Sequence, residues 1–277
     1  MRRLYLEIPH LYPKIEIVCE DVKVSRYLCY LFAPYIFQHP KKEIKYSRLM
    51  FVRNENGELT VASSELKEVL NEGIVSFLQK YLLENSYTEG GFLTLHGACM
   101  IYENKAMIFL ADSMIGKSTL SAFLYHKGFG YVTDDRVIVD TNKKVVIPFP
   151  KPIMLRPGGK EVLMKRYELD IETMQFKCGR IFRELLITNV SYNEVIPVKR
   201  IYVLSRNEKC DLVESEIKRE NRMDKFLKYN LSIKDLKKTT EIMQLSEIYM
   251  KEICFSDLNE MYNFLKKDVS EEGKTFK

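Results

Sequence analysis

The stretch FLADSMIGKSTL, from Phe109 to Leu120, decides the fold because it has the residue order of a phosphate-binding loop. Such a loop follows the pattern G-x-x-x-x-G-K-[ST] between a buried strand and a helix. Ala111 stands where the first glycine would be, while Gly116, Lys117 and Ser118 hold the last three positions. The competing interpretation is an ordinary turn before an ordinary helix.

The sequence on either side of this stretch favours the loop. AMIFLA, residues 106–111, is typical of a buried strand, and STLSAFLYH, residues 118–126, predicts a helix that ends before Gly128. In a phosphate loop, successive backbone N–H groups converge on the phosphates at a helix N-terminus. Lys117, expected to be solvated, then reaches the terminal phosphates, and Ser118 offers its hydroxyl to Mg²⁺. Ala111 is compatible with this loop if its φ is negative.

Two acidic residues, Asp134 and Asp135, end the next predicted strand. Acids at the C-terminal ends of strands line the sites of α/β folds. Adjacent side chains on an extended backbone point to opposite faces, so one carboxylate can hold Mg²⁺ or its water while the other faces an acceptor hydroxyl as a base. An acidic pair that only forms a turn is the alternative. His96, in LHGA on the preceding strand, either faces the site or is a core histidine.

Composition limits the classes of function. The chain has 277 residues, 46% of them hydrophobic, so it can bury a sizeable core in one large or two small domains. The net charge of +5 comes from mixed acids and bases, which suits an anionic ligand but does not predict binding to nucleic acid. The six cysteines are scattered without metal-ligand spacing, which indicates reduced, buried side chains. No apolar run has the length of a membrane helix, and the N-terminus does not read as a signal peptide. We therefore expect a cytoplasmic protein that binds neither nucleic acid nor membrane.

The pattern of the sequence changes near residue 90. Residues 1–90 predict an N-terminal α+β extension with alternating strands, a hairpin around Asn54–Gly57 and a helix over 63–86. Residues 91–277 predict an α/β domain with a mixed sheet. Its tail is expected to be mostly helical, with helices over 221–230, 233–250 and 257–267.

The residues from His96 through Asp140 resemble the catalytic core of the HPr kinase family. That family has a His-Gly strand, a loop of the form G-[DE]-S-G-x-G-K-S and a strand that ends in Ala-Asp-Asp. The positions of this chain that match the loop and the acidic pair are Asp112, Ser113, Gly116, Lys117, Ser118, Asp134 and Asp135. Ala111 and Met114 replace two loop glycines, and Thr133 replaces the usual alanine. A side chain at position 114 is compatible with the loop if the backbone there is not forced into positive φ.

The resemblance implies a P-loop kinase core of the HPr kinase and phosphoenolpyruvate carboxykinase type, which uses ATP or another NTP with Mg²⁺. The nucleotide-binding residues that it implies are Asp112, Ser113, Met114, Ile115, Gly116, Lys117, Ser118 and Thr119. Ser118 and Asp135 would hold Mg²⁺, and Asp134 would be the base, although the roles of the two carboxylates can be exchanged.

The same resemblance implies catalytic roles for further residues. Lys117 would act in catalysis by neutralising the terminal phosphates, and His96 would support the acceptor or an aspartate. Arg156 or Arg136 would stabilise transition-state charge, unless these are ordinary surface arginines.

The sequence around Phe149–Pro152 resembles the shorter members of this group. Those members include free-serine kinases and kinases encoded with ribosomal peptides such as lasso peptides. We therefore predict transfer of the γ-phosphate to a serine hydroxyl of a peptide or small protein, with a lasso-type precursor first and free L-serine second. Residues 1–90 would then pack on the catalytic core or recognise the acceptor. A nucleotide sensor or scaffold without transfer, a carboxykinase-like or NTP-hydrolysing enzyme, and a homo-oligomeric state remain open alternatives.

Overall fold

The structure is a computed structural model that describes residues 1–70, 74–86, 91–149, 152–178, 181–186, 194–207, 211–231 and 239–270. It consists of two compact units, Met1–Gly90 and Gly91–Lys277. The division falls where the sequence pattern changes. No helix in the described ranges is both long enough and apolar enough to cross a membrane.

The first unit is a six-stranded mixed sheet in the order β3-β1-β2-β4-β5-β6. Its strands are β1 (Arg2–Leu6), β2 (Lys14–Cys19), β3 (Ile36–Phe37), β4 (Tyr46–Arg53), β5 (Leu59–Ala62) and β6 (Lys67–Val69). The helices are α1 (Val22–Leu31) and α2 (Ile74–Ser86), with a short 3₁₀ turn at Ala33–Tyr35. Asp21 caps α1 by accepting hydrogen bonds from the backbone of Lys23 and Val24. Phe77 of α2 packs edge-on against Phe51 of β4, which places this helix on the sheet.

The predicted hairpin is confirmed, but half of the predicted helix is wrong. β4 and β5 pair antiparallel around a turn in which Gly57 has φ +78°. The helix expected over 63–86 is formed only from Ile74 onward, and Lys67–Val69 is instead the edge strand β6. The Ser63 hydroxyl accepts backbone hydrogen bonds from Glu65 and Leu66, which makes a turn rather than a helix start. Pairing with β5 then gives β6 the hydrogen bonds that a helix would have supplied.

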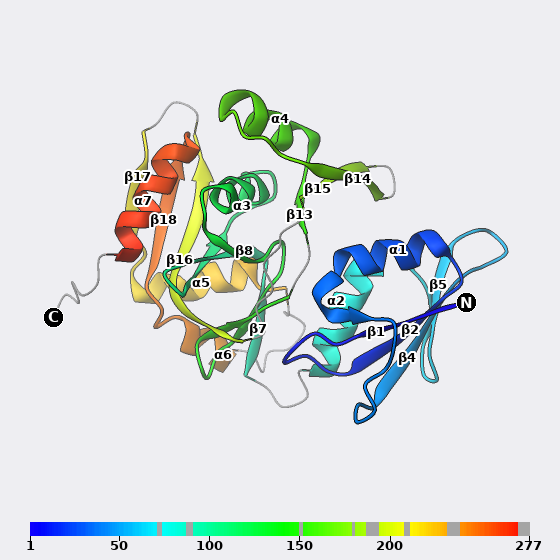
Figure 1. Cartoon of the computed structure of the whole chain (residues 1–277). Coiled ribbons are helices and arrows are strands. Elements are labelled where there is room, and N and C mark those ends of the chain that lie inside the picture. The colour runs from blue at the N-terminus through cyan, green and yellow to red at the C-terminus, as the bar shows by residue number, and fades with distance from the viewer. Residues whose placement is uncertain are drawn as a thin grey trace. The chain divides into compact units, whose positions relative to one another are not determined.

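The second unit is built on a nine-stranded mixed sheet in the order β10-β8-β9-β16-β12-β11-β7, with β18 beside β16 and β17 beside β18. A separate three-stranded sheet has the order β13-β15-β14. The strands are β7 (Phe92–Leu95), β8 (Gly97–Tyr102), β9 (Lys105–Leu110), β10 (Gly130–Thr133), β11 (Val137–Asp140), β12 (Val145–Ile147), β13 (Ile153–Leu155), β14 (Thr173–Cys178), β15 (Ile181–Leu186), β16 (Ile196–Arg206), β17 (Val213–Glu216) and β18 (Met250–Phe255). The helices are α3 (Lys117–His126), α4 (Pro157–Arg166), α5 (Arg219–Tyr229), α6 (Thr239–Leu245) and α7 (Leu258–Ser270) (Figure 1).

Alternating residues of β9 explain how the helices cover both faces of this sheet. Met107 and Phe109 belong to an apolar cluster that includes side chains of α3, α4 and α7. Ile108 and Leu110 belong to a second cluster that includes side chains of α5 and α6. Because strand side chains alternate between faces, these two clusters lie on opposite sides of the sheet.

The direction of the strands decides where the loops meet. β16 pairs parallel with β9 and with β18. β8 pairs antiparallel with both β9 and β10, so β10 runs in the same direction as β9. The C-terminal ends of β9, β10, β16 and β18 therefore lie at one edge of the sheet, together with the beginning of β8. Sites of α/β folds form at this kind of edge.

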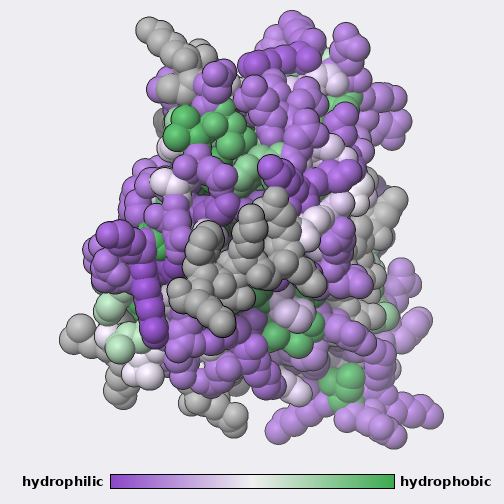
Figure 2. Space-filling model, turned by 90° about the vertical axis from the view of Figure 1, so that its left-hand side faces the viewer, coloured by the Kyte–Doolittle hydropathy of each residue, from purple (hydrophilic) through white to green (hydrophobic). Residues whose placement is uncertain are grey.

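The tail contains more strand than expected. The helix predicted over 233–250 is confirmed only as α6, Thr239–Leu245, and residues 232–238 lie outside the described ranges. Met250–Phe255 is the strand β18, which pairs with β16. β17 closes this side of the sheet with four exposed residues, among them Glu214 and Glu216, and charged side chains are a common protection of a sheet edge. Figure 2 views the molecule from the side of α7 and β17 and shows a mostly hydrophilic surface with small, separate apolar patches.

Candidate functional site

The stretch between β9 and α3 forms a loop that bends through the left-handed region. Gly116 precedes α3 with φ +106° and ψ 22°, a conformation that favours glycine. Met114 has φ +75° and is 79% exposed, so the condition set for a side chain at this position, a backbone that is not forced into positive φ, is not met. Ala111 is not among the residues with positive φ, and it is fully buried at the end of β9. Alanine at the entry position is therefore accommodated without strain.

Lys117 lies folded against its own loop. Its ammonium group donates hydrogen bonds to the backbone oxygens of Ala111 at 2.6 Å and Asp112 at 3.3 Å. The residue is only 8% exposed, so the expectation of a solvated lysine is wrong. Burial lowers the pKa of Lys117, and the charges of nearby aspartates, Asp134 foremost, oppose that shift. A ligand phosphate would compete with the loop carbonyls for this ammonium group.

Ser118 and Asp134 join the first turn of α3 to the end of β10. The Ser118 hydroxyl donates a hydrogen bond of 2.7 Å to Oδ2 of Asp134, which is 2% exposed. Asp135 has φ +74°, so the two acids do not lie on an extended backbone as expected. They do not point to opposite faces of a strand but line the same cavity. The left-handed residue turns the chain so that both carboxylates reach it.

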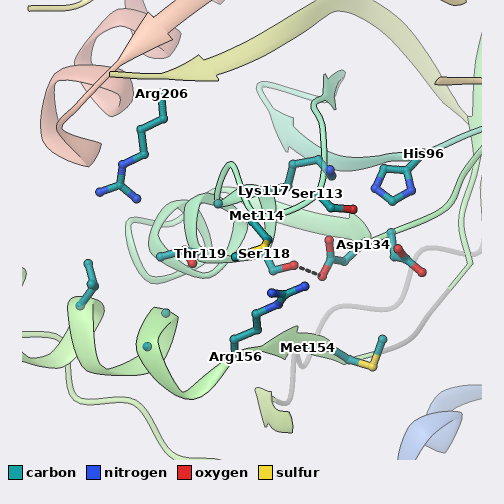
Figure 3. A pocket seen from close by; sticks show the side chains of 15 residues that line it. His96, Ser113, Met114, Lys117, Ser118, Thr119, Asp134, Met154, Arg156 and Arg206 are labelled. Carbon is teal, nitrogen blue, oxygen red and sulfur yellow. Dashed lines mark hydrogen bonds between the residues drawn. The ribbon is translucent and has the colours of Figure 1, made fainter. Parts of the chain in front are cut away.

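These groups surround a cavity of about 590 Å³ within the second unit (Figure 3). Its lining includes most of the residues that the sequence pointed to, namely His96, Ser113, Met114, Gly116, Lys117, Ser118, Thr119, Asp134, Asp135 and Arg156. The residues that sequence reasoning missed are Met154, Gly158, Gly159, Val162 and Arg206. The cavity lies at the sheet edge where β9, β10 and β16 end.

Three residues that the sequence pointed to do not line the cavity. The Asp112 carboxylate forms an exposed ion pair with Lys228 of α5 at 2.8 Å. Ile115 packs against the apolar cluster of α3 and α7. Arg136 is also absent from the lining. Of the loop residues, Ser113, Met114 and Gly116 therefore line the cavity. The side chains of Asp112 and Ile115 make other contacts.

His96 reaches the cavity because β8 starts at the same edge where β9 ends. Its backbone N–H donates to the Tyr229 oxygen at 2.7 Å. Burial lowers the pKa of His96, the charge of Lys117 lowers it further, and Asp135 and Asp134 act in the opposite direction. The imidazole is therefore neutral at neutral pH. At the next residue, Gly97, a Cβ would lie 2.7 Å from the Phe109 oxygen, so only glycine allows β8 this close to β9.

Two arginines enter the cavity from different elements. Arg156 immediately precedes α4 in an extended conformation, and Arg206 is the last residue of β16. Both are exposed, and neither forms an ion pair within the described ranges. Arg206 could have been predicted from the sequence, because it lies near the C-terminal end of the predicted strand PVKRIYVLSRN. The C-terminal ends of strands line the sites of α/β folds.

The lining of the cavity carries more positive than negative side chains. Its charged residues are the three cations Lys117, Arg156 and Arg206 and the two carboxylates Asp134 and Asp135. The N-terminus of α3, with its free N–H groups and dipole, adds to the attraction for an anion. The arrangement suits a ligand with several negative charges.

Comparisons with known proteins find matches among solved structures. No protein-family model matches the chain, and no curated protein matches it. Among solved structures, the Hpr(Ser) kinase/phosphatase from Coxiella burnetii is 15% identical and covers 63% of this chain and 89% of its own, with a TM-score of 0.32. A TM-score of 0.32 is too low to support a fold or a function for this chain. The function proposed below therefore rests on the geometry of the cavity.

Proposed function

We propose that this chain is an NTP-dependent kinase whose active site is the cavity between the phosphate loop, the acidic pair and Arg156. One observation carries the proposal: Ser118, at the N-terminus of α3 and after Gly116-Lys117, is hydrogen-bonded to Asp134 at the end of a neighbouring strand. This is the arrangement in which a P-loop enzyme holds phosphates and a divalent cation.

The phosphates would lie against the backbone N–H groups of residues 113–118. Lys117 would release the carbonyls of Ala111 and Asp112 and bind the terminal phosphates. A charge-assisted bond to phosphate is stronger than a bond to a neutral carbonyl, so this exchange is favourable. Arg156 would add positive charge where charge develops during transfer.

The residues present fit Mg²⁺. The Ser118 hydroxyl and the Asp134 carboxylate are hard oxygen donors within 2.7 Å of each other, and Mg²⁺ takes such donors together with substrate phosphates and water. When bound, the ion would neutralise charge on the phosphates. The hydrogen bond from Ser118 supports the exchanged roles of the acids, with Asp134 rather than Asp135 on the magnesium side.

Asp135 is then the base. Its carboxylate would accept the proton of the acceptor hydroxyl while the hydroxyl oxygen forms a bond to the γ-phosphorus. The bond from that phosphorus to the β–γ bridging oxygen breaks, and the NDP leaves with the electron pair. Neutral His96, which Asp135 influences electrostatically, would orient this carboxylate or the acceptor.

We propose a serine hydroxyl of a peptide or small protein as the acceptor, with a lasso-type ribosomal precursor first and free L-serine second. The first unit supports a macromolecular acceptor, because it is a compact fold with its own sheet and core, separate from the catalytic groups. A recognition role gives this unit a function in the same reaction.

The experiment is a transfer assay with MgATP and three acceptors: precursor peptides, free L-serine and HPr. Mass spectrometry should show one added phosphate on a serine. Phosphate release that is the same with and without every acceptor would instead identify an NTP-hydrolysing enzyme. Tight nucleotide binding without transfer or hydrolysis would identify a sensor, which the hydrogen bonds of Lys117 to its own loop would then explain.

A further inference from the structure

The cavity has two ends, and the acidic pair occupies only one of them. Figure 3 shows Arg206 on the far side of Thr119 from Asp134. A Cβ built on Gly116 would lie 3.8 Å from Nη1 of Arg206, so the guanidinium stands beside the entrance to α3. Arg206 is therefore separated from the groups that act on the transferred phosphate.

The direction of the triphosphate follows from the proposed function, on which this inference rests. Lys117, Ser118 and Asp134 take the terminal phosphates. A P-loop holds the phosphates in sequence along its backbone and the helix N-terminus, so the remaining phosphate must extend away from Asp134. That direction leads past Thr119 toward Arg206.

Arg206 is placed and charged for such a phosphate. Ser205 and Arg206 pair in register with Cys254 and Phe255 of β18, which fixes the backbone from which the side chain projects. The side chain is exposed and has no ion-pair partner in the part of the chain that the structure describes. A planar guanidinium binds phosphate oxygens through two parallel hydrogen bonds.

We propose that Arg206 binds the α-phosphate of the nucleotide. Arg206 would bind the part of the nucleotide that leaves as NDP. Arg156 would instead lie near the phosphate that is transferred. A contact to a phosphate that every NTP shares strengthens binding without selecting the base. Because the contact is the same before and during transfer, it affects binding of substrate and transition state alike.

The test compares Arg206→Gln, Arg206→Lys and the control Arg219→Gln, a residue of α5 that pairs with Glu247 and does not line this cavity. Calorimetry with MgATP, MgADP, MgGTP and MgCTP gives the affinities, and steady-state kinetics give kcat and KM. Arg206→Gln should lose roughly 10- to 100-fold in affinity for all four nucleotides by the same factor, with kcat at saturation unchanged. Arg206→Lys should recover part of the loss, and Arg219→Gln should behave as wild type.

Three results would overturn the assignment of Arg206 and leave the kinase proposal intact. They are equal affinities for wild type and Arg206→Gln, a loss that depends on the base, and a loss in kcat without a loss in affinity. Wild-type protein that binds none of the nucleotides would overturn the kinase proposal itself. Thermal unfolding of the apo variant should match wild type, because an exposed arginine without a described partner contributes little to stability.

Discussion

The hydroxyl of Ser118 donates a hydrogen bond of 2.7 Å to Oδ2 of Asp134, so the beginning of α3 and the end of β10 share one polar contact. The two residues are 16 positions apart in the chain. This contact distinguishes the two acids. Asp134 is hydrogen-bonded to the residue whose hydroxyl binds the metal ion in a P-loop. Asp135 is the next residue in the chain and has a left-handed backbone conformation.

The first prediction separates the two carboxylates. Asp135→Asn should bind MgATP about as well as wild type and lose transfer by roughly 10²- to 10⁴-fold, because it lacks the base. Asp134→Asn should lose the advantage of MgATP over metal-free ATP in binding, because the carboxylate near the metal position is gone. Calorimetry with and without Mg²⁺, combined with single-turnover transfer, checks both variants. The reverse outcome would restore Asp134 as the base.

The second prediction concerns Lys117→Ala. Transfer should be abolished, and the apo protein should also lose stability. The ammonium group is buried and satisfies the carbonyl of fully buried Ala111, so its removal should cost about 1 kcal/mol, or about 2–4 °C in Tm. The control is Lys228→Ala, which removes an exposed ion pair with Asp112 and should change Tm by less. An apo Tm equal to that of wild type would mean that the lysine is solvated after all.

The third prediction concerns Met114, which is exposed and has φ +75°. Met114→Gly should keep activity and raise stability by up to about 1 kcal/mol, because glycine adopts this conformation without strain. Met114→Val should lower stability, because a β-branched residue tolerates positive φ least. Chemical denaturation of the two variants gives the comparison. A less stable glycine variant would show that the methionine side chain makes a contact that outweighs its backbone strain.

The fourth prediction concerns Gly158 and Gly159 at the start of α4. A Cβ at Gly159 would lie 2.7 Å from the hydroxyl oxygen of Thr119, whereas one at Gly158 meets nothing within 4 Å. Gly159→Ala should therefore displace the Thr119 side chain in the cavity and raise the KM for MgATP. Gly158→Ala, the matched control, should leave KM unchanged. Equal KM values for the two variants would show that α3 and α4 adjust to the added methyl group without moving Thr119 in the cavity.

The fifth prediction is a pH dependence that arises from His96. Burial holds the pKa of this residue below its ordinary value of 6.5, so the unfolded chain takes up the proton first as pH falls. The contribution of His96 to the free energy of unfolding is fully present above pH 6.5. It is lost as the pH falls from 6.5 through the pKa of His96 in the folded protein. His96→Gln should therefore lose less stability than wild type between about pH 7.5 and about pH 5.5 in chemical denaturation. Parallel curves for the two proteins would mean that the histidine does not titrate differently on folding.

The sequence by itself determined the local features of the site. FLADSMIGKSTL predicted β9, the loop and α3, and the acidic pair was expected at the end of a strand, where it follows β10. Each of these features depends on neighbouring residues: an apolar run that suits a strand, a glycine that suits a left-handed turn and a helix that starts at once. The hairpin of β4 and β5 was predictable for the same reason.

Only the tertiary structure decided which distant groups meet this loop. Arg206 enters the cavity because β16 pairs parallel with β9, and Arg156 enters it at the start of α4, after β13. The strand β6 forms where helix was expected, because the neighbouring strand β5 supplies its hydrogen bonds. The strand β18 forms in a tail that was expected to be mostly helical, because the distant strands β16 and β17 pair with it. Burial of Lys117 and the positive φ of Asp135 likewise follow from packing at the sheet edge. A local pattern encodes hydrogen bonds within a few residues, whereas strand pairing and burial depend on contacts that only the folded chain makes.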